Sequence, residues 1–315
     1  MTSKELRKRQ GWTLPQKIDH SLGVIDQFIS RVKGKAYVAF SGGKDSTVLL
    51  HLCRLIKPDI PAVFVNTGCE SPSIIKFVRQ TNLTMGGGVI TLHPKKRTKQ
   101  VWAEFGFPLV SKQVSHDVHA IRNNPNCTVA KKVLSDDNEY KLAERWRYLL
   151  TADYDVSQRC CDILKKQPCH EFEKKTRLRP ILGTMASESR LRALAYLARG
   201  GCNEFHLIPY ATSLPLSIWL DEDIWGYIRD RKLAYADIYD KGATRTGCVG
   251  CGFGAYAPDD CRFDILYELY PKYYDMLMRY ENNGVTFRCA LREMLAVTGK
   301  VLPDERQGLF ARQAR

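Results

Sequence analysis

The sequence has 315 residues, of which 44% are hydrophobic and 26% are charged. This balance is typical of a water-soluble globular protein and excludes a disordered, collagen-like or short disulfide-stapled chain. No apolar run approaches the ~20 residues that a membrane-spanning helix needs, and the basic N-terminus leads into no apolar stretch. We therefore expect a cytoplasmic protein without a membrane partner.

Two features of the composition narrow the function. Lysine and arginine total 48 against 34 acidic residues, and the formal net charge of +14 favours polyanionic partners. The sequence also has eleven cysteines. In a reducing compartment, cysteines are thiols, metal ligands or catalysts more often than disulfides.

Strands and helices alternate along the first third of the chain. In chain order, hydrophobic spacing predicts a helix over 14–32, a strand over 36–40, a helix after residue 47, a strand over 61–65, a helix from residue 73 and a strand over 89–92. A polar, mostly helical stretch over 112–158, a strand over 205–209 and a helix over 218–228 follow. The alternation predicts an α/β fold with a parallel twisted sheet and helices on both faces.

The amino-acid composition changes near residue 240, where glycine, cysteine and aromatic residues become frequent. We expect a nucleotide-binding domain over 1–240 and a C-terminal, cysteine-bearing and mainly helical region over 241–315.

The segment Ser41-Gly-Gly-Lys-Asp-Ser46 joins the first predicted strand to a helix. Its glycines let the backbone approach an anion, and the free N–H groups of a helix start point at such a ligand. Hydroxyl groups and the charge of Lys44 add further donors. The spacing is not that of a Walker loop, because Asp45 follows Lys44 and no glycine lies five residues before it. A tight turn is the structural alternative, but this set of residues after a strand favours phosphate binding.

This segment resembles the PP-loop of the N-type ATP pyrophosphatases, and in particular their phosphoadenylyl-sulfate (PAPS) reductase-like branch. Further matching segments are Asn66-Thr-Gly68, 183–192, 215–219, 223–225 and 245–248, so the resemblance covers about residues 35 to 260. It implies an adenine nucleotide alpha hydrolase-like fold, and ATP cleaved between the α and β phosphates to adenylate a substrate.

The resemblance also implies roles for individual residues. Lys44, Asp45 and Ser46 would be catalytic, and together with Ser41, Gly42, Gly43 and Thr47 they would hold the phosphates of ATP with Mg²⁺. The remaining nucleotide-binding residues would be Asn66, Thr67, Gly68, Gly183, Glu188 and Arg192. Two positions depart from the family pattern. Asn66 stands where many members have an acid, and Met185 stands where a Gly-x-Arg sequence would place a sulfonate-binding cation.

Four cysteines form a pattern typical of metal binding: the adjacent pair Cys160-Cys161 and the pair Cys248-x-x-Cys251. Four thiolates can bind Zn²⁺ or an iron–sulfur cluster. Two consecutive residues can hardly reach one zinc ion, whereas a cubane offers them separate irons. The pattern also resembles the cysteines that hold the [4Fe-4S] cluster of adenylyl-sulfate reductases. A cluster is favoured, while zinc and unligated core thiols remain alternatives. Cys69 and Cys289 have no assigned role.

Basic runs adjoin these motifs, at 93–99, around residues 165–179, and at Arg190 and Arg192. Each phosphate contact to a nucleic acid needs such a cation. We therefore expect DNA or tRNA as a partner, and the resemblance adds a cysteine desulfurase as sulfur donor. The sequence indicates no oligomeric state.

Two reactions compete. The first is adenylation of a nucleic acid for sulfur insertion, as in relatives that phosphorothioate DNA or thiolate tRNA. The second is adenylyl-sulfate or PAPS reduction to sulfite, which uses a nucleophilic cysteine in a Glu-Cys-Gly motif that this sequence lacks. Cys289 has different neighbours, so sulfur transfer is favoured. A non-catalytic nucleotide-binding module is a third alternative.

Overall fold

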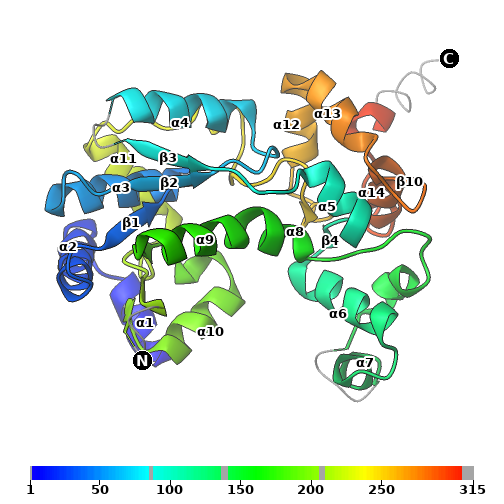
Figure 1. Ribbon diagram of the computed structural model, residues 1–315, viewed down its shortest axis with the longest axis horizontal. Helices are drawn as coiled ribbons and strands as arrows, with labels where there is room; N and C mark the ends of the chain where they lie inside the picture. Colours follow the sequence, from blue (N-terminus) through cyan, green and yellow to red (C-terminus); the bar gives the residue numbers. More distant parts are fainter. Residues whose placement is uncertain (1, 85–87, 136–140, 206–209, 307–315) are drawn as a thin grey trace. The chain divides into compact units, whose positions relative to one another are not determined.

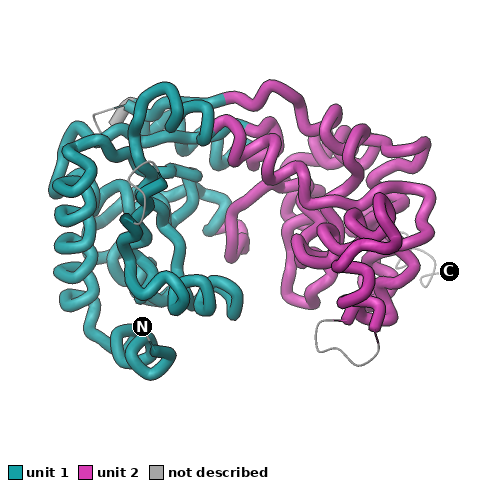
Figure 2. Tube along the Cα trace, turned by 60° about the horizontal axis from the view of Figure 1, so that its bottom comes forward, with its two compact units in different colours: residues 1–66, 72–92, 169–239 teal, residues 67–71, 93–168, 240–315 magenta. Residues whose placement is uncertain are grey.

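The computed structural model describes residues 2–84, 88–135, 141–205 and 210–306. The chain divides into two compact units, shown in different colours in Figure 2. Unit 1 comprises residues 1–66, 72–92 and 169–239, and unit 2 comprises residues 67–71, 93–168 and 240–315. One division between the units therefore falls at 239/240, close to the expected domain boundary. Unit 2 differs from the expected C-terminal region because it also contains 67–71 and 93–168.

Unit 1 is built on a six-stranded sheet with the order β3-β2-β1-β5-β7-β6. Its strands are β1 (Ala36–Ala39), β2 (Ala62–Val65), β3 (Val89–Leu92), β5 (Arg179–Ile181), β6 (Asn203–Glu204) and β7 (Thr212–Ser213). Strand β1 pairs in parallel with β2 and β5, and the β2–β3 and β5–β7 pairs are also parallel. Strand β6 is antiparallel to β7. The connection between these two strands is too short for the crossover that a parallel pair requires, so the expected parallel sheet is in fact mixed at this edge.

Helices lie on both faces of this sheet (Figure 1), which confirms the predicted α/β class. They are α1 (Ser3–Gln10), α2 (Leu14–Arg31), α3 (Lys44–Ile56), α4 (Pro72–Thr84), α9 (Gln167–Thr176, whose first two residues fall in unit 2), η3 (Ala186–Glu188), α10 (Arg190–Arg199) and α11 (Asp221–Asp230). Helix α3 is apolar on most of its surface, and Val48, Leu49, Leu50 and Leu52 are fully buried. Such burial on several faces is expected of a helix packed against both a sheet and further helices.

The predicted helices and strands of the first 92 residues are confirmed to within a few residues. The strand expected at 205–209 lies largely outside the described residues, since 206–209 are not described. The helix expected at 218–228 begins later, at Asp221. The Asp223 carboxylate accepts the backbone N–H of Leu220 at 2.7 Å, and this contact fixes the start of the helix after Leu220.

Unit 2 is mainly helical. Its helices are α5 (Thr98–Phe105), α6 (Lys112–Asn123), α7 (Thr128–Val133), η1 (Glu144–Leu150), α8 (Arg159–Cys161), η2 (Asp162–Lys166), α12 (Arg262–Leu269), α13 (Pro271–Met278) and α14 (Phe287–Ala296). Strands β4 (Leu109–Val110) and β8 (Gly252–Phe253) pair in parallel, and β9 (Glu281–Asn282) pairs antiparallel with β10 (Val285–Thr286).

One hydrophobic core joins the middle and the C-terminal part of the chain in unit 2. The rings of Trp102 and Phe287 lie 4.6 Å apart between centroids, and those of Phe107 and Phe287 lie 5.3 Å apart. Because these aromatic residues bury their surface together, residues 93–168 fold with the C-terminal region rather than with the sheet. Among the described helices of both units, none has the length and apolarity that crossing a membrane requires.

Candidate functional site

The glycine-rich segment lies at the end of β1, where the sheet of unit 1 changes direction. The chain continues from β1 to β2 on one side, whereas β5 pairs with β1 on the other side. Ligands of open α/β sheets bind beyond the carboxyl ends of the strands at such a switch point. The segment from Ser41 to Gly43 occupies this position, and α3 begins directly after it at Lys44.

Hydrogen bonds within the segment fix its shape. The backbone N–H of Ser41 donates to Ser46 Oγ at 3.1 Å, and the two serine hydroxyls share a second bond at 3.1 Å. The hydroxyls of Ser46 and Thr47 donate to the carbonyl of Gly43 at 2.9 and 3.0 Å. The loop therefore closes on the first turn of α3 and presents N–H and hydroxyl groups at a helix N-terminus, as anion binding requires.

Two glycines are needed for this geometry. Gly42 has a φ of +74°, and a Cβ there would lie 2.9 Å from Val78 Cγ2. At Gly183, which follows β5, a Cβ would lie 3.3 Å from the backbone of Asp45. The structure thus brings Gly183 against the start of α3.

Lys44 lies between two carboxylates. Its Nζ donates to Asp45 Oδ1 at 2.8 Å and also contacts Asp221 Oδ1, while its backbone N–H donates to the Tyr239 hydroxyl at 2.9 Å. Burial alone would lower the pKa of Lys44, but the two carboxylates outweigh it and hold this pKa above its ordinary value. Sequence reasoning missed Asp221 and Tyr239. The acidic run 221–223 was a signal for the first, whereas nothing in the sequence marked the second.

Two further predicted nucleotide-binding residues of unit 1, Glu188 and Arg192, follow Gly183 in the chain. Glu188 forms an ion pair with Arg192 and accepts the backbone N–H of Met185 at 3.0 Å. The Met185 residue is buried, with 2% of its surface exposed. The position that would carry a cation in a Gly-x-Arg sequence is therefore an apolar part of the core.

The Asn66-Thr-Gly68 segment is divided between the units. Asn66 ends the unit 1 segment, and its backbone N–H donates to the Leu92 carbonyl at 2.9 Å. Thr67 and Gly68 belong to unit 2, where Glu70 accepts both the N–H and the hydroxyl of Thr67 at 2.9 and 2.8 Å. Gly68 has a φ of +77°, which favours glycine at that turn.

The four cysteines of the predicted metal site all lie in unit 2. Cys160 and Cys161 form the end of α8, and the π-helical turn η2 follows them. Cys248 and Cys251 lie in a turn whose Cys251 N–H donates to the Cys248 carbonyl at 3.1 Å. Gly252 is required after this turn, because a Cβ there would lie 2.6 Å from the Pro108 carbonyl oxygen.

The thiols interact electrostatically, which shows that the two pairs are neighbours. The hydrogen bond to Cys161, burial, and the charges of Cys161, Cys251 and Cys248 raise the pKa of Cys160. The hydrogen bond from Cys160, with Lys112 and Lys165 nearby, lowers the pKa of Cys161. Burial raises the pKa of Cys251 to about 11.

Cationic groups surround these thiols. The charge of Cys248 is the main cause that raises the pKa of Lys165, and the Arg262 guanidinium donates to the Cys251 carbonyl at 2.8 Å. Four thiols with cationic neighbours are chemically suited to a cluster that carries net negative charge. Within the described ranges, no three His, Cys, Asp or Glu side chains form a group that could hold one metal ion. The cluster and zinc assignments both remain predictions.

The two cysteines without an assigned role are held differently. Cys69 is buried, its carbonyl accepts the Val249 N–H at 2.7 Å, and burial raises the pKa of its thiol to about 12. Cys289 lies in the first turn of α14, where the Thr286 hydroxyl donates to its Sγ at 3.3 Å. The Cys69 thiol is therefore protonated at neutral pH, as expected of a residue packed in the core.

The chain is similar in sequence to several known proteins. An uncharacterized protein of Methanocaldococcus jannaschii is 28% identical over 266 residues, which are 82% of this chain and 52% of that protein. A second uncharacterized protein of that organism is 24% identical over 74% of this chain and 39% of its own length. The chain therefore spans about half or less of the length of these two relatives. The adenosine 5′-phosphosulfate reductase of Staphylococcus epidermidis is 23% identical over 70% of this chain and 72% of its own.

Among solved structures, the phosphoadenylyl-sulfate reductase of Candida auris aligns with a TM-score of 0.46 and 13% identity, over 79% of this chain and 96% of that one. The sequence itself matches the phosphoadenosine phosphosulfate reductase domain over residues 35–131 and 121–252. These matched residues span more than half of the chain and include the glycine-rich loop and all four clustered cysteines. The chain belongs to the phosphoadenosine phosphosulfate reductase domain family, as its glycine-rich loop predicts.

Proposed function

We propose that this protein is an ATP pyrophosphatase that adenylates nucleic acid for sulfur transfer. The observation that carries the proposal is the position of Lys44 between the carboxylates of Asp45 and Asp221, at the start of α3 and directly after the glycines of the loop. Mg²⁺ is commonly bound by one or two carboxylates together with substrate phosphates. A dianionic sulfonucleotide bound without a metal would instead be repelled by both acids. The pair of carboxylates therefore favours Mg²⁺·ATP.

The residues of the loop would act mainly on the phosphates. The N–H and hydroxyl groups of Ser41, Gly43 and Ser46, which bond within the loop in this structure, would exchange those bonds for the β and γ phosphates. Lys44 would neutralise the charge that develops on departing pyrophosphate. An acceptor oxygen attacks the α-phosphorus, so that an acceptor–phosphorus bond forms and the bond to pyrophosphate breaks. Hydrosulfide, which a thiol reductant releases from the persulfide of the sulfur donor, then attacks the activated atom of the acceptor. A bond to sulfur forms, the bond to the adenylated oxygen breaks, and AMP leaves with that oxygen.

The four cysteines of unit 2 would hold an iron–sulfur cluster. Cys160, Cys161, Cys248 and Cys251 supply four thiolates, and Lys165 and Arg262 offset their negative charge. When bound, the cluster would supply redox-active iron for handling sulfur. Zn²⁺ would supply no redox chemistry, which makes the identity of the metal a test of this part of the proposal.

Nucleic acid is proposed as the acceptor because of the charge of the chain. A formal net charge of +14 exceeds what one nucleotide requires, and it matches a polyanion such as DNA or tRNA. Sulfur would come from a cysteine desulfurase, as for relatives that insert sulfur into nucleic acids.

Release of pyrophosphate from Mg²⁺·ATP tests the proposal directly. The anaerobically purified protein is assayed alone, with duplex DNA and with unmodified tRNA, and the Lys44→Ala variant serves as the negative control. We expect release that nucleic acid stimulates and that the variant abolishes. Absence of release under all three conditions contradicts the proposal.

A second candidate function is reduction of adenylyl sulfate to sulfite. The likeness to the Staphylococcus epidermidis reductase favours it. Against it, none of the eleven cysteines lies in a Glu-Cys-Gly sequence, and Met185 is buried where a sulfonate-binding cation is expected. Sulfite formation from adenylyl sulfate and a dithiol, without pyrophosphate release from ATP, would establish this second function instead.

A further inference from the structure

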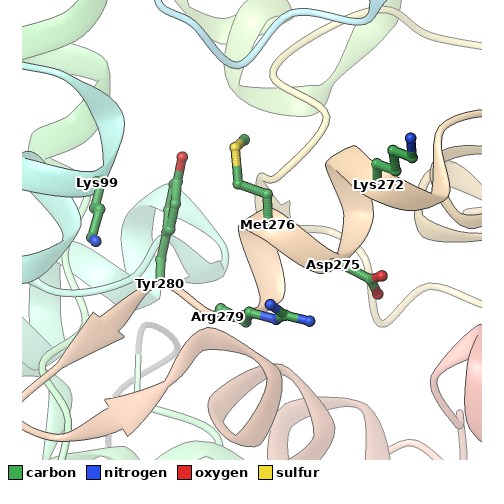
Figure 3. A pocket seen from close by; sticks show the side chains of 6 residues that line it. All are labelled: Lys99, Lys272, Asp275, Met276, Arg279 and Tyr280. Carbon is green, nitrogen blue, oxygen red and sulfur yellow. The ribbon is translucent and has the colours of Figure 1, made fainter.

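A pocket of about 410 Å³ opens on the surface of unit 2 (Figure 3), and none of the four cysteines of the predicted metal site lines it. Lys99 of α5 lines one part of it, and one face of α13 with the two residues that follow lines the rest. The residues from this second wall are Lys272, Asp275, Met276, Arg279 and Tyr280. The positions 272, 275, 276 and 279 follow the spacing of neighbours on one helix face.

The charge of this pocket is unbalanced. Lys99, Lys272 and Arg279 face a single acid, Asp275, which leaves a net charge of about +2 at neutral pH. Within the described parts of the chain, none of these three cations forms an ion pair. Six other arginines of unit 2 (Arg122, Arg147, Arg262, Arg288, Arg292 and Arg306) each pair with a carboxylate. The pocket therefore offers cations that are available to an anionic ligand.

The two walls of the pocket are fixed to each other. The rings of Trp102 on α5 and Tyr280 lie 5.7 Å apart in an edge-to-face arrangement. The Asn282 side chain donates to the carbonyls of Trp102 and Ala103, both at 3.0 Å. Because α5 and the segment after α13 are joined in this way, the pocket is formed before a ligand arrives, and binding costs little ordering of the chain.

Both walls also hold the segment that carries two of the predicted nucleotide-binding residues. Thr98, next to Lys99, donates its hydroxyl to the Thr67 carbonyl at 3.0 Å. Tyr273, next to Lys272, donates its hydroxyl to the Gly68 carbonyl at 2.7 Å. The cationic pocket and the Thr67–Gly68 turn are thus parts of one hydrogen-bonded arrangement within unit 2.

We propose that this pocket binds one nucleotide of a single-stranded nucleic acid and so places the acceptor strand beside the Thr67–Gly68 turn. Lys272 and Arg279 bind backbone phosphates, and Arg279 has the fork geometry that suits them. Tyr280 offers an aromatic ring to an unpaired base, and Asp275 accepts from the amino groups of bases. A base that is paired in a duplex cannot enter such a pocket. This inference rests on the proposed function and names the region that contacts its acceptor.

Binding of fluorescently labelled 20-nucleotide oligo-dT and oligo-U, measured by anisotropy over a series of salt concentrations, tests the inference. The full chain is compared with the double variant Lys272→Ala/Arg279→Ala, whose two side chains are exposed, so that the fold is preserved. The matched control is Lys131→Ala/Lys141→Ala, which removes the same charge from exposed positions of unit 2 outside the pocket.

We expect the pocket variant to bind at least about tenfold more weakly at roughly 50 mM salt, with a salt dependence whose slope falls by about 1.4, or ~0.7 for each lost phosphate contact. The control should change affinity by less than about threefold, because neither Lys131 nor Lys141 lines the pocket and exposed charges are partly screened by salt. If the pocket variant loses more affinity for oligo-dT than for oligo-U, the acceptor is DNA; the opposite result assigns it as RNA. Equal affinities of the pocket variant and the control variant overturn the inference.

Two competitors and one parallel assay sharpen the outcome. Displacement of the oligonucleotide by polyglutamate, or by a 20-base-pair duplex, at the same concentration as an unlabelled single strand overturns single-strand recognition. Pyrophosphate release is followed in the same samples. If nucleic acid stimulates release equally in both double variants, the pocket assignment fails while the proposed function stands. If no release occurs but binding depends on the pocket, the proposed function fails and the pocket assignment stands.

Discussion

The glycine-rich loop of unit 1 and the four-cysteine group of unit 2 are assembled in different ways. The loop consists of seven consecutive residues, 41–47, and its shape comes from hydrogen bonds among them. The cysteines come from two segments separated by residues 162–247, and the core of unit 2 brings these segments together. The backbone shape of the loop depends mainly on its own segment, with Asp221 and Tyr239 added to Lys44 from elsewhere in unit 1. A site made from distant segments depends instead on the folding of the whole unit. Variants that affect the loop without the cysteines, or the cysteines without the loop, test this difference.

The largest effect is expected at Lys44. Replacing Lys44 with alanine removes the cation that would stabilise departing pyrophosphate, and we expect release to fall by about 10²- to 10³-fold. The free energy of unfolding should change by less than about 1 kcal/mol, because the two carboxylates left behind, Asp45 and Asp221, both reach solvent. The measurements are pyrophosphate release and denaturant unfolding. Lys57→Ala, which removes an exposed ion pair with Asp59, is the control.

If Lys44→Ala lowers the free energy of unfolding as strongly as it lowers pyrophosphate release, the fold of unit 1 depends on Lys44. This outcome would contradict the contrast between the two sites.

The next prediction concerns the metal. The double variant Cys248→Ser/Cys251→Ser should lose all bound iron and acid-labile sulfide, while binding of ATP to the loop persists. Loss of metal should also lower the thermal stability of unit 2, because metal binding and folding are coupled. Elemental analysis and visible absorption after anaerobic purification measure the first effect.

Cys127→Ser is the matched control for this pair, since its Sγ accepts the Ala130 N–H at the start of α7, a position that serine also suits. Wild-type protein that carries zinc and no iron would refute the cluster assignment.

Two glycines, one beside each site, allow the same difference to be tested through the backbone. Gly42→Ala places a Cβ 2.9 Å from Val78 at a φ of +74°, and Gly252→Ala places one 2.6 Å from the Pro108 carbonyl. Each should lower the free energy of unfolding by about 1–3 kcal/mol. We expect Gly42→Ala to impair ATP binding and keep the metal, and Gly252→Ala to do the reverse.

Gly23→Ala is the control for both glycine variants. It lies within α2, has open space around its Cβ position, and should raise stability by about 0.5–1 kcal/mol. Loss of both functions in either glycine variant would show that the units are not independent.

The smallest effect is expected at Asp221. Its carboxylate is exposed and contacts Lys44, so Asp221→Asn should raise the Mg²⁺ concentration needed for half-maximal pyrophosphate release by about threefold to tenfold. Titration of Mg²⁺ at saturating ATP measures this shift. Glu222→Gln removes a neighbouring charge in the same helix turn and should leave the titration unchanged. An equal shift in both variants would assign the effect to the helix terminus rather than to Asp221.

The same contrast explains how much could be read from the sequence. The loop, its helix and the strand before it follow from local patterns, and the structure agrees closely for residues 14–92. The partners Asp221 and Tyr239 could not be predicted, because they reach Lys44 from segments about 177 and 195 positions further along the chain.

The extent of unit 2 could not be predicted either. It depends on aromatic residues such as Trp102 and Phe287, which find each other only in the folded core. The antiparallel edge strand β6 had no signal of its own, since its two residues are too few to show a period.

The hydrogen bond between the Lys44 backbone and Tyr239 has a thermodynamic consequence. A phosphate oxygen that takes this N–H must displace the tyrosine hydroxyl, so the contact is an exchange and adds little net affinity. Selectivity for a highly charged ligand would then come from the ammonium of Lys44 rather than from its backbone. Tyr239 is the last residue of unit 1 before the chain enters unit 2 at Asp240. Any ligand that takes the Lys44 N–H would therefore release the side chain of the residue at which the chain leaves unit 1 from its bond to Lys44.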